Sequence, residues 1–222
     1  MYVIAAPTHP SLPTAHGLWP VRRIFCVGRN YADHAREMGH DPNAEPPFYF
    51  TKPADAVVPS GATIPYPPQT ADLHHEAELV VAVGTGGTDI DEATALSHVW
   101  GYAAGNDLTR RDLQAAAKTA RRPWDMAKGF DLSAVVGLIR PGPIDMSATL
   151  TCSVDGQQTQ SARLSDMIWP VTAIIAHLSR LVTLAPGDLI FTGTPAGVGP
   201  LTRGQTCTVQ IEGLAPATIT IA

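Results

Sequence analysis

The chain has 222 residues, of which 45% are hydrophobic and 16% charged, and its formal net charge is −5. This length suits one large domain or two small ones, and an acidic chain with no long basic run is not expected to bind nucleic acid. No apolar stretch approaches the roughly 20 residues of a membrane span, no signal peptide is indicated, and three widely spaced cysteines indicate no disulfide framework. We therefore expect a cytoplasmic protein with neither a nucleic-acid nor a membrane partner.

The proline content, 20 of 222 residues, favours turns and strands over a helical bundle. We expect residues 1–20 to form an N-terminal extended arm and residues 21–222 to form a single domain. The first half of that domain is predicted to contain a strand over 22–28, a helix over 30–39, a loop over 41–47, a strand over 48–53 and extended chain over 57–68. Asn30 is the expected N-cap of the helix, and Gly39 is its expected stop.

The second half of the chain has three predicted helices among strands. In chain order we expect a strand over 73–84, a helix over 91–100, a strand over 101–109, a helix over 109–121, a loop over 122–131, a hairpin over 148–160, a helix over 171–184, a turn, strand and Gly-rich loop over 185–201, and strands over 205–213 and 217–222. Thr109 and Asp112 resemble a capping box, and Asp155-Gly156 indicates the hairpin turn. The predicted fold is mostly β, of the α+β class, with a mixed sheet and short peripheral helices.

Two glutamates stand at the entrance of the apolar strand over residues 73–84. Glu76 and Glu78 point to the same face because side chains alternate along a strand, and two adjacent half-buried carboxylates repel each other. They can be the exposed charges of a solvated strand end, or they can bind Mg²⁺ or Mn²⁺, which prefer carboxylate oxygens. Asp107, at the polar end of another strand, is the candidate third ligand, although it can equally be a cap or turn residue.

His74 and His75 adjoin this pair and raise the alternative of a zinc site. Neighbouring residues of a strand face opposite sides, so both imidazoles cannot join a metal that Glu76 also binds unless the strand is distorted. The chain also contains none of the usual CxxC or HExxH zinc-binding spacings.

Three further patterns suit catalysis but have structural explanations as well. His34 and Glu37 share one face of a predicted helix, where the carboxylate would make the imidazole a better general base; such pairs also occur on exposed helices. Lys128 can neutralise a developing enolate or be merely exposed. The segment GTPAGVG, which begins at Gly193, can bring backbone N–H groups and Thr194 to a bound anion, or it can be a tight turn.

Six segments occur in the order CVGRNYADHAREMG, FTKP, HHEAEL, GNDLTRRD, WDMAKGFD and PGDLIFTGTPAGVG. Together they resemble the fumarylacetoacetate hydrolase family, from about residue 22 to the C-terminus. The resemblance is to the short, single-domain branch that contains acylpyruvate and fumarylpyruvate hydrolases. It implies the mixed β-roll of the family's C-terminal domain, with residues 21–222 as the catalytic domain, and a homodimer.

The resemblance also implies roles for particular residues. One Mg²⁺ or Mn²⁺ per subunit would be held by Glu76, Glu78 and Asp107, with Lys128 beside it. His34 and Glu37 would be a water-activating dyad on a mobile lid helix. The matching positions that line or adjoin the family's site are Arg29, Lys52 and Thr194.

The implied reaction is hydrolysis of a C–C bond in a 2,4-diketo acid, with fumarylpyruvate giving fumarate and pyruvate in aromatic degradation. The far carboxylate of such a substrate needs a cation, and the sequence does not choose among Arg29, Arg110, Arg111, Arg121 and Arg122. The alternatives are a general acylpyruvate hydrolase, an oxaloacetate decarboxylase, an isomerase or hydratase of related oxo acids, a zinc hydrolase that uses the histidines, and a non-catalytic protein.

Overall fold

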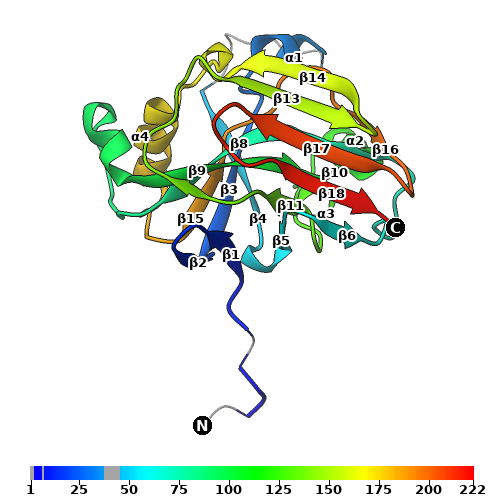
Figure 1. Cartoon of the computed structure of the whole chain (residues 1–222), viewed down its shortest axis with the longest axis horizontal. Helices are drawn as coiled ribbons and strands as arrows, with labels where there is room; N and C mark the ends of the chain where they lie inside the picture. The colour runs from blue at the N-terminus through cyan, green and yellow to red at the C-terminus, as the bar shows by residue number, and fades with distance from the viewer. Residues whose placement is uncertain (1–2, 7, 38–45) are drawn as a thin grey trace.

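The computed structural model describes residues 3–6, 8–37 and 46–222, and Figure 1 shows strands as its dominant elements. The largest sheet of this described part has eight strands. Its hydrogen-bonded order is β4 (Phe48–Lys52), β3 (Arg23–Gly28), β15 (Asp188–Phe191), β8 (Ala77–Val83), β9 (Val99–Asp107), β11 (Ala134–Val136) and β5 (Val57–Pro59), and β12 (Arg140–Pro141) also pairs with β9. Parallel and antiparallel pairs both occur, so the sheet is mixed, as the sequence predicts.

A second sheet of five strands packs over the first (Figure 1). Its order is β14 (Gln157–Arg163), β13 (Thr149–Val154), β17 (Thr206–Ile211), β18 (Ala217–Ile221) and β6 (Ala62–Ile64). The predicted hairpin between β13 and β14 turns at Asp155 and Gly156, which both have positive φ angles of 51° and 83°.

Strand β8 lies at the centre of the larger sheet and is buried along its whole length. Leu79 and Val81 pack into the core beneath the five-stranded sheet, whereas Val80 and Ala82 pack into a second cluster on the opposite face. A strand that is covered on both faces needs apolar residues at every position. This burial explains the continuous apolar run that follows the two glutamates.

A third, three-stranded sheet begins just before β8. Its order is β10 (Thr109–Arg110), β7 (Leu73–His75) and β16 (Gly199–Leu201). The single strand predicted over residues 73–84 is therefore two strands, β7 and β8, which belong to different sheets and are separated at Glu76. Glu76 is thus placed at a break in the strand, where the chain passes from one sheet to another.

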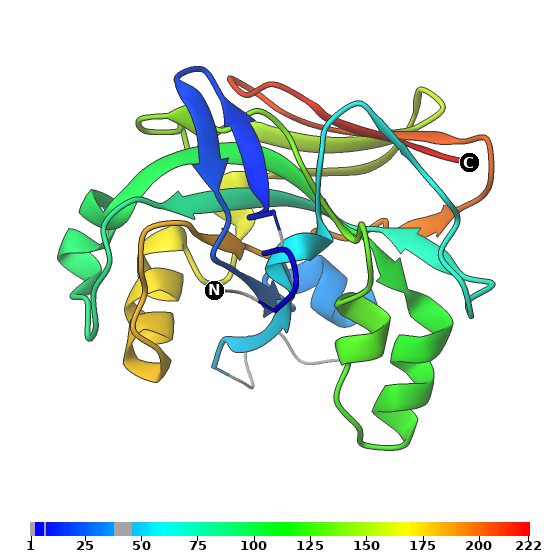
Figure 2. The ribbon, with the colours of Figure 1, turned by 90° about the horizontal axis from the view of Figure 1, so that it is seen from below.

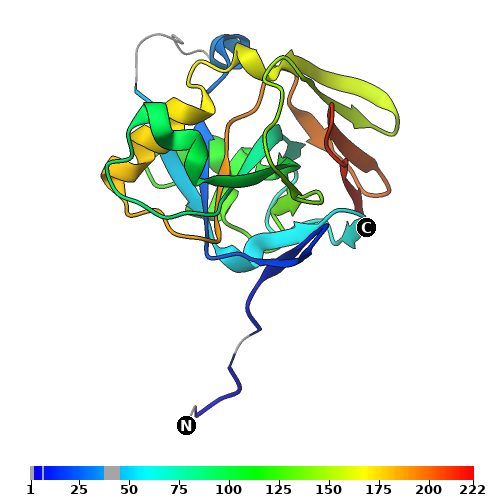
Figure 3. The same cartoon turned by 60° about the vertical axis from the view of Figure 1, so that its left-hand side comes forward.

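The N-terminal segment differs in part from the extended arm predicted over residues 1–20. Strands β1 (Ser11–Thr14) and β2 (Gly17–Pro20) form an antiparallel hairpin that buries Leu12 and Trp19. The described residues before β1 are mostly exposed and lead away from the body of the molecule (Figure 3). The division of the chain into an arm and a catalytic domain stays a prediction.

Helices lie towards opposite ends of the molecule, with α1 between them (Figure 2). They are α1 (Ala32–Glu37), α2 (Arg111–Thr119), α3 (Asp125–Lys128) and α4 (Val171–Leu181), with 3₁₀ turns η1 (Ala54–Ala56), η2 (Glu92–His98) and η3 (Leu164–Asp166). Figure 2 shows α2 and α3 side by side at one end and α4 near η2 at the other. No helix in the described ranges is long and apolar enough to cross a membrane.

Several local predictions were wrong. Asn30 does not cap α1, because its side chain bonds to Trp169 and Thr192 instead. Thr109 does not cap α2, which begins after Arg110 without a side-chain cap. The helix predicted over 91–100 is a 3₁₀ turn followed by β9, and the loop predicted over 122–131 contains α3. The predicted Gly39 stop and most of the loop over 41–47 lie outside the described residues.

Candidate active site

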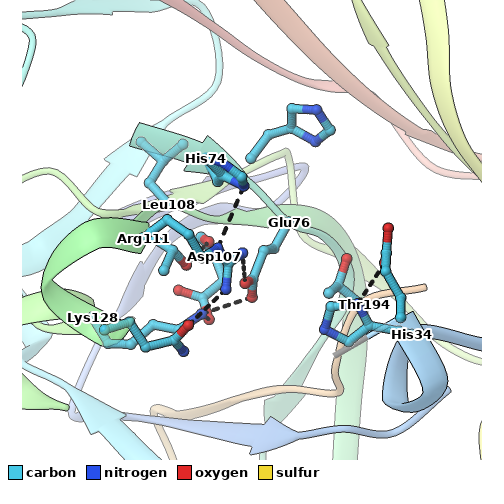
Figure 4. Close-up of polar contacts among 12 residues, drawn as sticks. His34, His74, Glu76, Asp107, Leu108, Arg111, Lys128 and Thr194 are labelled. Carbon is cyan, nitrogen blue, oxygen red and sulfur yellow. Dashed lines mark hydrogen bonds and ion pairs between the residues drawn. The ribbon is translucent and has the colours of Figure 1, made fainter. Parts of the chain in front are cut away.

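Three carboxylates meet at one end of the main sheet. Glu78 on β8 and Asp107 at the end of β9 project from the same face, and Glu76 joins them from the break before β8. Their oxygens lie within 4.8 Å of one another, and all three residues are buried. Figure 4 labels Glu76 and Asp107 together with Lys128, and it shows Glu76 between Lys128 and His34.

Cations surround these carboxylates. Lys128 Nζ donates hydrogen bonds of 2.7 Å to both Glu76 and Asp107, and Arg111 forms an ion pair of 2.5 Å with Glu76 (Figure 4). Burial would raise the pKa of Glu76, but the charges of Lys128 and Arg111 outweigh it and hold that pKa below its usual range. Glu76 is therefore a carboxylate at neutral pH despite its burial.

Glu78 has a different environment. Its described hydrogen-bond donor is the Gly193 N–H, at 2.7 Å. Burial raises its pKa well above the usual range, and the negative charges of Asp107 and Glu76 act in the same direction. Lys128 opposes this shift without removing it. Among the described residues, Glu78 is thus the one member of the three carboxylates without a side-chain cation at ion-pair distance.

The donor set fits a divalent cation. Three buried carboxylates within reach of one ion are the oxygen ligands that Mg²⁺ and Mn²⁺ prefer. The Lys128 ammonium already stands between Glu76 and Asp107, so their arrangement accepts a positive charge. Asp107 Oδ1 lies 2.7 Å from Lys52 Nζ, yet it has no hydrogen bond with the described residues. This oxygen can therefore accept a further ligand.

His34 and Glu37 form the predicted pair on α1. His34 Nδ1 lies 3.2 Å from Glu37 Oε2, and the Gly197 N–H also points to Glu37 at 3.3 Å. His34 is buried and lines the same pocket as Glu76 and Glu78. Burial lowers the pKa of His34, although Glu76 and Glu37 raise it in part. The imidazole is therefore neutral at pH 7. Glu37 accepts a hydrogen bond from Nδ1–H, and this tautomer leaves the lone pair of Nε2 to act as a base.

The Gly-rich segment that follows β15 contacts the carboxylate cluster through its backbone. Gly193 has a φ angle of +98°, and a Cβ there would lie 2.7 Å from the Cβ of Asn30. Its N–H donates a hydrogen bond to Glu78. Thr194 lines the pocket, and its hydroxyl accepts a hydrogen bond of 2.8 Å from Gln160. The N–H predicted to bind an anion thus holds a carboxylate of the protein.

The remaining predicted binding residues separate into two groups. Arg29 and Arg111 line the pocket. Lys52 does not line it: this buried ammonium lies behind Asp107 and donates to the backbone carbonyls of Leu108 and Lys128. Among the other candidate arginines, Arg110 stacks over Phe130, outside the pocket. Lys52 therefore contacts the carboxylate cluster from outside the pocket lining, and its predicted role in substrate binding stays a prediction.

The two histidines considered as zinc ligands face apart. His74 bonds to Asp72 at 2.9 Å, whereas His75 is buried against Gln160 and Cys152. His75, Cys152 and Cys207 form a second group whose side chains could hold a metal, but it does not include Glu76. Neither histidine joins the three carboxylates.

Sequence reasoning missed several residues of the site. Asn106 accepts a hydrogen bond from the Glu76 N–H, and Gln114 lines the pocket and accepts from Arg111. Three aromatic residues, Phe48, Phe50 and Trp124, form an apolar wall. A polar side chain in a buried strand, next to Asp107, was the one signal that could have indicated Asn106.

Residues 23–222 match the family model of the fumarylacetoacetate hydrolase C-terminal domain. The chain therefore belongs to the fumarylacetoacetate hydrolase family, which confirms the resemblance found in the sequence and the mostly β fold that it implies. The similar proteins described next carry the names of enzymes.

Three of these relatives bear on the reaction. The chain is 43% identical over 183 residues to a fumarylpyruvate hydrolase of Ralstonia sp, which covers 82% of this chain and 95% of the relative. It is also 43% identical over 197 residues to a mitochondrial oxaloacetate decarboxylase of Dictyostelium discoideum, covering 87% and 90%. A crystal structure of fumarylpyruvate hydrolase from Pseudomonas aeruginosa in complex with Mn²⁺ and pyruvate superposes with a TM-score of 0.96 at 46% identity, covering 100% and 99% of the two chains.

Proposed function

We propose that this protein is a divalent-metal-dependent hydrolase that cleaves the C–C bond of a 2,4-diketo acid, with fumarylpyruvate as the favoured substrate. The observation that carries the proposal is that one pocket is lined both by His34, a neutral base, and by Glu76 and Glu78, two members of the carboxylate cluster that Asp107 completes. A metal site without a base would suit binding alone. A base without a metal site would have no cation beside it to polarise the substrate carbonyl. The fumarylpyruvate hydrolases similar to the chain support this substrate.

The three carboxylates would hold the metal, Mg²⁺ or Mn²⁺. When bound, the metal supplies Lewis-acid polarisation of the carboxylate and 2-oxo oxygens of the substrate. The Mn²⁺ in the similar P. aeruginosa structure supports this choice of ion. Lys52 and Asn106 keep Asp107 and Glu76 in place for this role.

His34 is the proposed general base. Its Nε2 would take a proton from water, and Glu37 would stabilise the imidazolium that forms at the other nitrogen. The water oxygen attacks the 4-oxo carbon, and the C3–C4 bond then breaks, with its electron pair passing to the enolate of pyruvate. Return of a proton to C3 gives pyruvate, and the acyl part leaves as a carboxylate, fumarate in the favoured case.

Lys128 and Arg111 are the proposed partners of the developing negative charge. The pKa of Lys128 is raised: burial lowers it, but the charges of Asp107 and Glu76 outweigh burial, so the ammonium stays charged. It lies in the same pocket as His34, where it can stabilise the enolate oxygen. Arg111, fixed by Glu76 and Gln114, would bind the substrate carboxylate.

Four further expectations stay predictions. They are the homodimer, the cytoplasmic location, the role in aromatic degradation and the closure of α1 as a lid over the substrate.

Oxaloacetate decarboxylation is the second candidate, because the D. discoideum relative carries that name at the same 43% identity. Decarboxylation also produces the pyruvate enolate, but it needs no attacking water. The proposed hydrolase therefore depends on the His34 and Glu37 pair, whereas a decarboxylase would not.

The test is a steady-state comparison of fumarylpyruvate, acetylpyruvate and oxaloacetate with Mg²⁺ or Mn²⁺, and with EDTA as the control. We expect fumarylpyruvate to lead in kcat/KM and EDTA to abolish its turnover. If oxaloacetate leads, the chain is a decarboxylase on the same site, and if acetylpyruvate leads, it is a general acylpyruvate hydrolase. Full activity in EDTA would overturn the metal dependence.

A further inference from the structure

The pocket extends beyond the carboxylates along an aromatic wall. Lys128 Nζ lies 4.9 Å from the centre of the Phe50 ring, and the Phe50 ring lies 5.9 Å from that of Trp124. Phe48 packs edge-on against Trp124 at 5.4 Å. The three rings line the same pocket as the proposed catalytic residues. They would suit a flat, apolar part of a substrate between two polar ends.

Lys118 stands where this wall ends. It projects from α2, its Nζ lies 5.2 Å from the centre of the Trp124 ring, and it lines the pocket. Among the residues that the structure describes, Lys118 has no carboxylate at ion-pair distance. It is half-buried, and burial lowers its pKa, as do the neighbouring charges of Arg111 and Arg29. A positive charge in such surroundings attracts an anion.

The other cationic side chains of the pocket have different contacts from those of Lys118. Lys128 is held by Glu76 and Asp107, and Arg111 by Glu76 and Gln114, all at the carboxylate end. Arg29 lies over the ring of Phe48 on the pocket wall. Lys118 thus differs from Lys128 and Arg111 in having an aromatic ring, rather than a carboxylate, as its described contact.

We propose that Lys118, seated on Trp124, binds the far carboxylate of the substrate and makes the pocket selective for dicarboxylates. The substrate would place its diketo acid end at the three carboxylates, its apolar middle along Phe50 and Trp124, and its far carboxylate at Lys118. This inference rests on the proposed function, since it names the specificity of the same pocket. It assigns to a lysine the role for which the sequence offered five arginines.

The test is Lys118→Met, assayed with fumarylpyruvate and with acetylpyruvate, which lacks the far carboxylate. We expect kcat/KM for fumarylpyruvate to fall roughly 10- to 100-fold, mainly through KM, because one charge-assisted contact is lost. The value for acetylpyruvate should stay within about twofold. Lys118→Arg should retain most of the preference. Arg121→Met is the matched control. It removes the same charge from an exposed residue just after α2 that does not line the pocket, and it should leave kcat/KM for both substrates unchanged.

A binding measurement separates this inference from the proposed function. Calorimetry on the Mn²⁺-loaded protein should show tighter binding of fumarate than of the monocarboxylate crotonate, and Lys118→Met should remove the difference. If fumarylpyruvate is not the preferred substrate but this difference depends on Lys118, the proposed function fails and the dicarboxylate site stands. The proposed role of Lys118 is overturned if Lys118→Met weakens the binding of fumarate and crotonate equally, or of neither. It is also overturned if the variant lowers the turnover of both substrates alike.

Discussion

At the scale of single residues, the site is a balance between carboxylates and cations in a buried place. Glu76 has two partners of opposite charge, Lys128 and Arg111, and its pKa is held low. Glu78 has a backbone N–H and two like charges nearby, and its pKa is raised. Two glutamates two positions apart thus have pKa shifts in opposite directions, because their partners differ and not because their burial does.

Glu37→Gln tests whether the proposed base and the proposed metal ligands have separate functions. Gln keeps an acceptor for His34 Nδ1 but removes the charge that stabilises the imidazolium, so we expect kcat for fumarylpyruvate to fall roughly 100-fold. Mn²⁺ affinity, measured by calorimetry, should stay within about twofold, because Glu37 does not belong to the carboxylate cluster. Equal losses of turnover and metal affinity would contradict the assigned roles.

The pH profile tests His34 itself. A base acts in its neutral form, and burial lowers the pKa of His34 from its ordinary value of 6.5. The acid limb of kcat/KM should therefore have its midpoint below pH 6.5, with full activity above it. Because Glu37 raises this pKa, the residual activity of Glu37→Gln should have its acid limb at lower pH than wild type. A wild-type midpoint above pH 7, or a limb that moves upward in the variant, would exclude His34 as the base.

At the scale of elements, short connections between strands and helices position the proposed catalytic groups. Asn30, just before α1, donates to the carbonyls of Trp169 and Thr192, which ties the start of this helix to the end of β15. The Gly193 backbone follows directly, packs against Asn30 and donates to Glu78. The proposed base and one proposed metal ligand are therefore positioned by the same pair of residues.

Gly193→Ala tests this arrangement against a matched control. Gly193 and Gly204 both have positive φ angles, +98° and +87°, but only at Gly193 does an added Cβ meet other atoms, Asn30 Cβ at 2.7 Å and Val27 O at 3.2 Å. Gly204→Ala should lower the free energy of unfolding by about 1 kcal/mol from backbone strain alone. Gly193→Ala should lower it by roughly 2–4 kcal/mol and should also weaken Mn²⁺ binding. Urea denaturation and calorimetry measure the two effects, and equal behaviour of both variants would refute the role of Gly193.

At the scale of the whole molecule, the sequence predicts elements better than their connections. The hairpin at Asp155-Gly156 and helix α4 were predicted because turn chemistry and apolar spacing are local signals. The break at Glu76 was not, because it depends on which sheet each half of the segment joins. The cap predictions for Asn30 and Thr109 failed for the same reason, because the side-chain partners of Asn30 and the strand that pairs with Thr109 are distant in sequence. The family motifs led to the carboxylate cluster, whereas Lys118 became a candidate only once the pocket brought it to Trp124.

The carboxylate cluster joins distant parts of the fold, so metal binding should stabilise the whole chain. Glu76 precedes β8, Asp107 ends β9, and Glu78 is tied to the segment after β15. An unfolded chain does not hold these groups together, so Mn²⁺ at 100 times its Kd should add about 2.7 kcal/mol to the free energy of unfolding. Glu78→Gln should abolish this gain while leaving the metal-free protein at least as stable as wild type. Burial and the charges of Asp107 and Glu76 already raise the pKa of Glu78, so its charged form is disfavoured and a neutral amide is tolerated there. Asp145→Asn, a change at an exposed carboxylate that does not line the pocket, should keep the full gain. Thermal unfolding with Mn²⁺ and with EDTA decides the matter: an equal rise of Tm in wild type and Glu78→Gln would place the ion elsewhere.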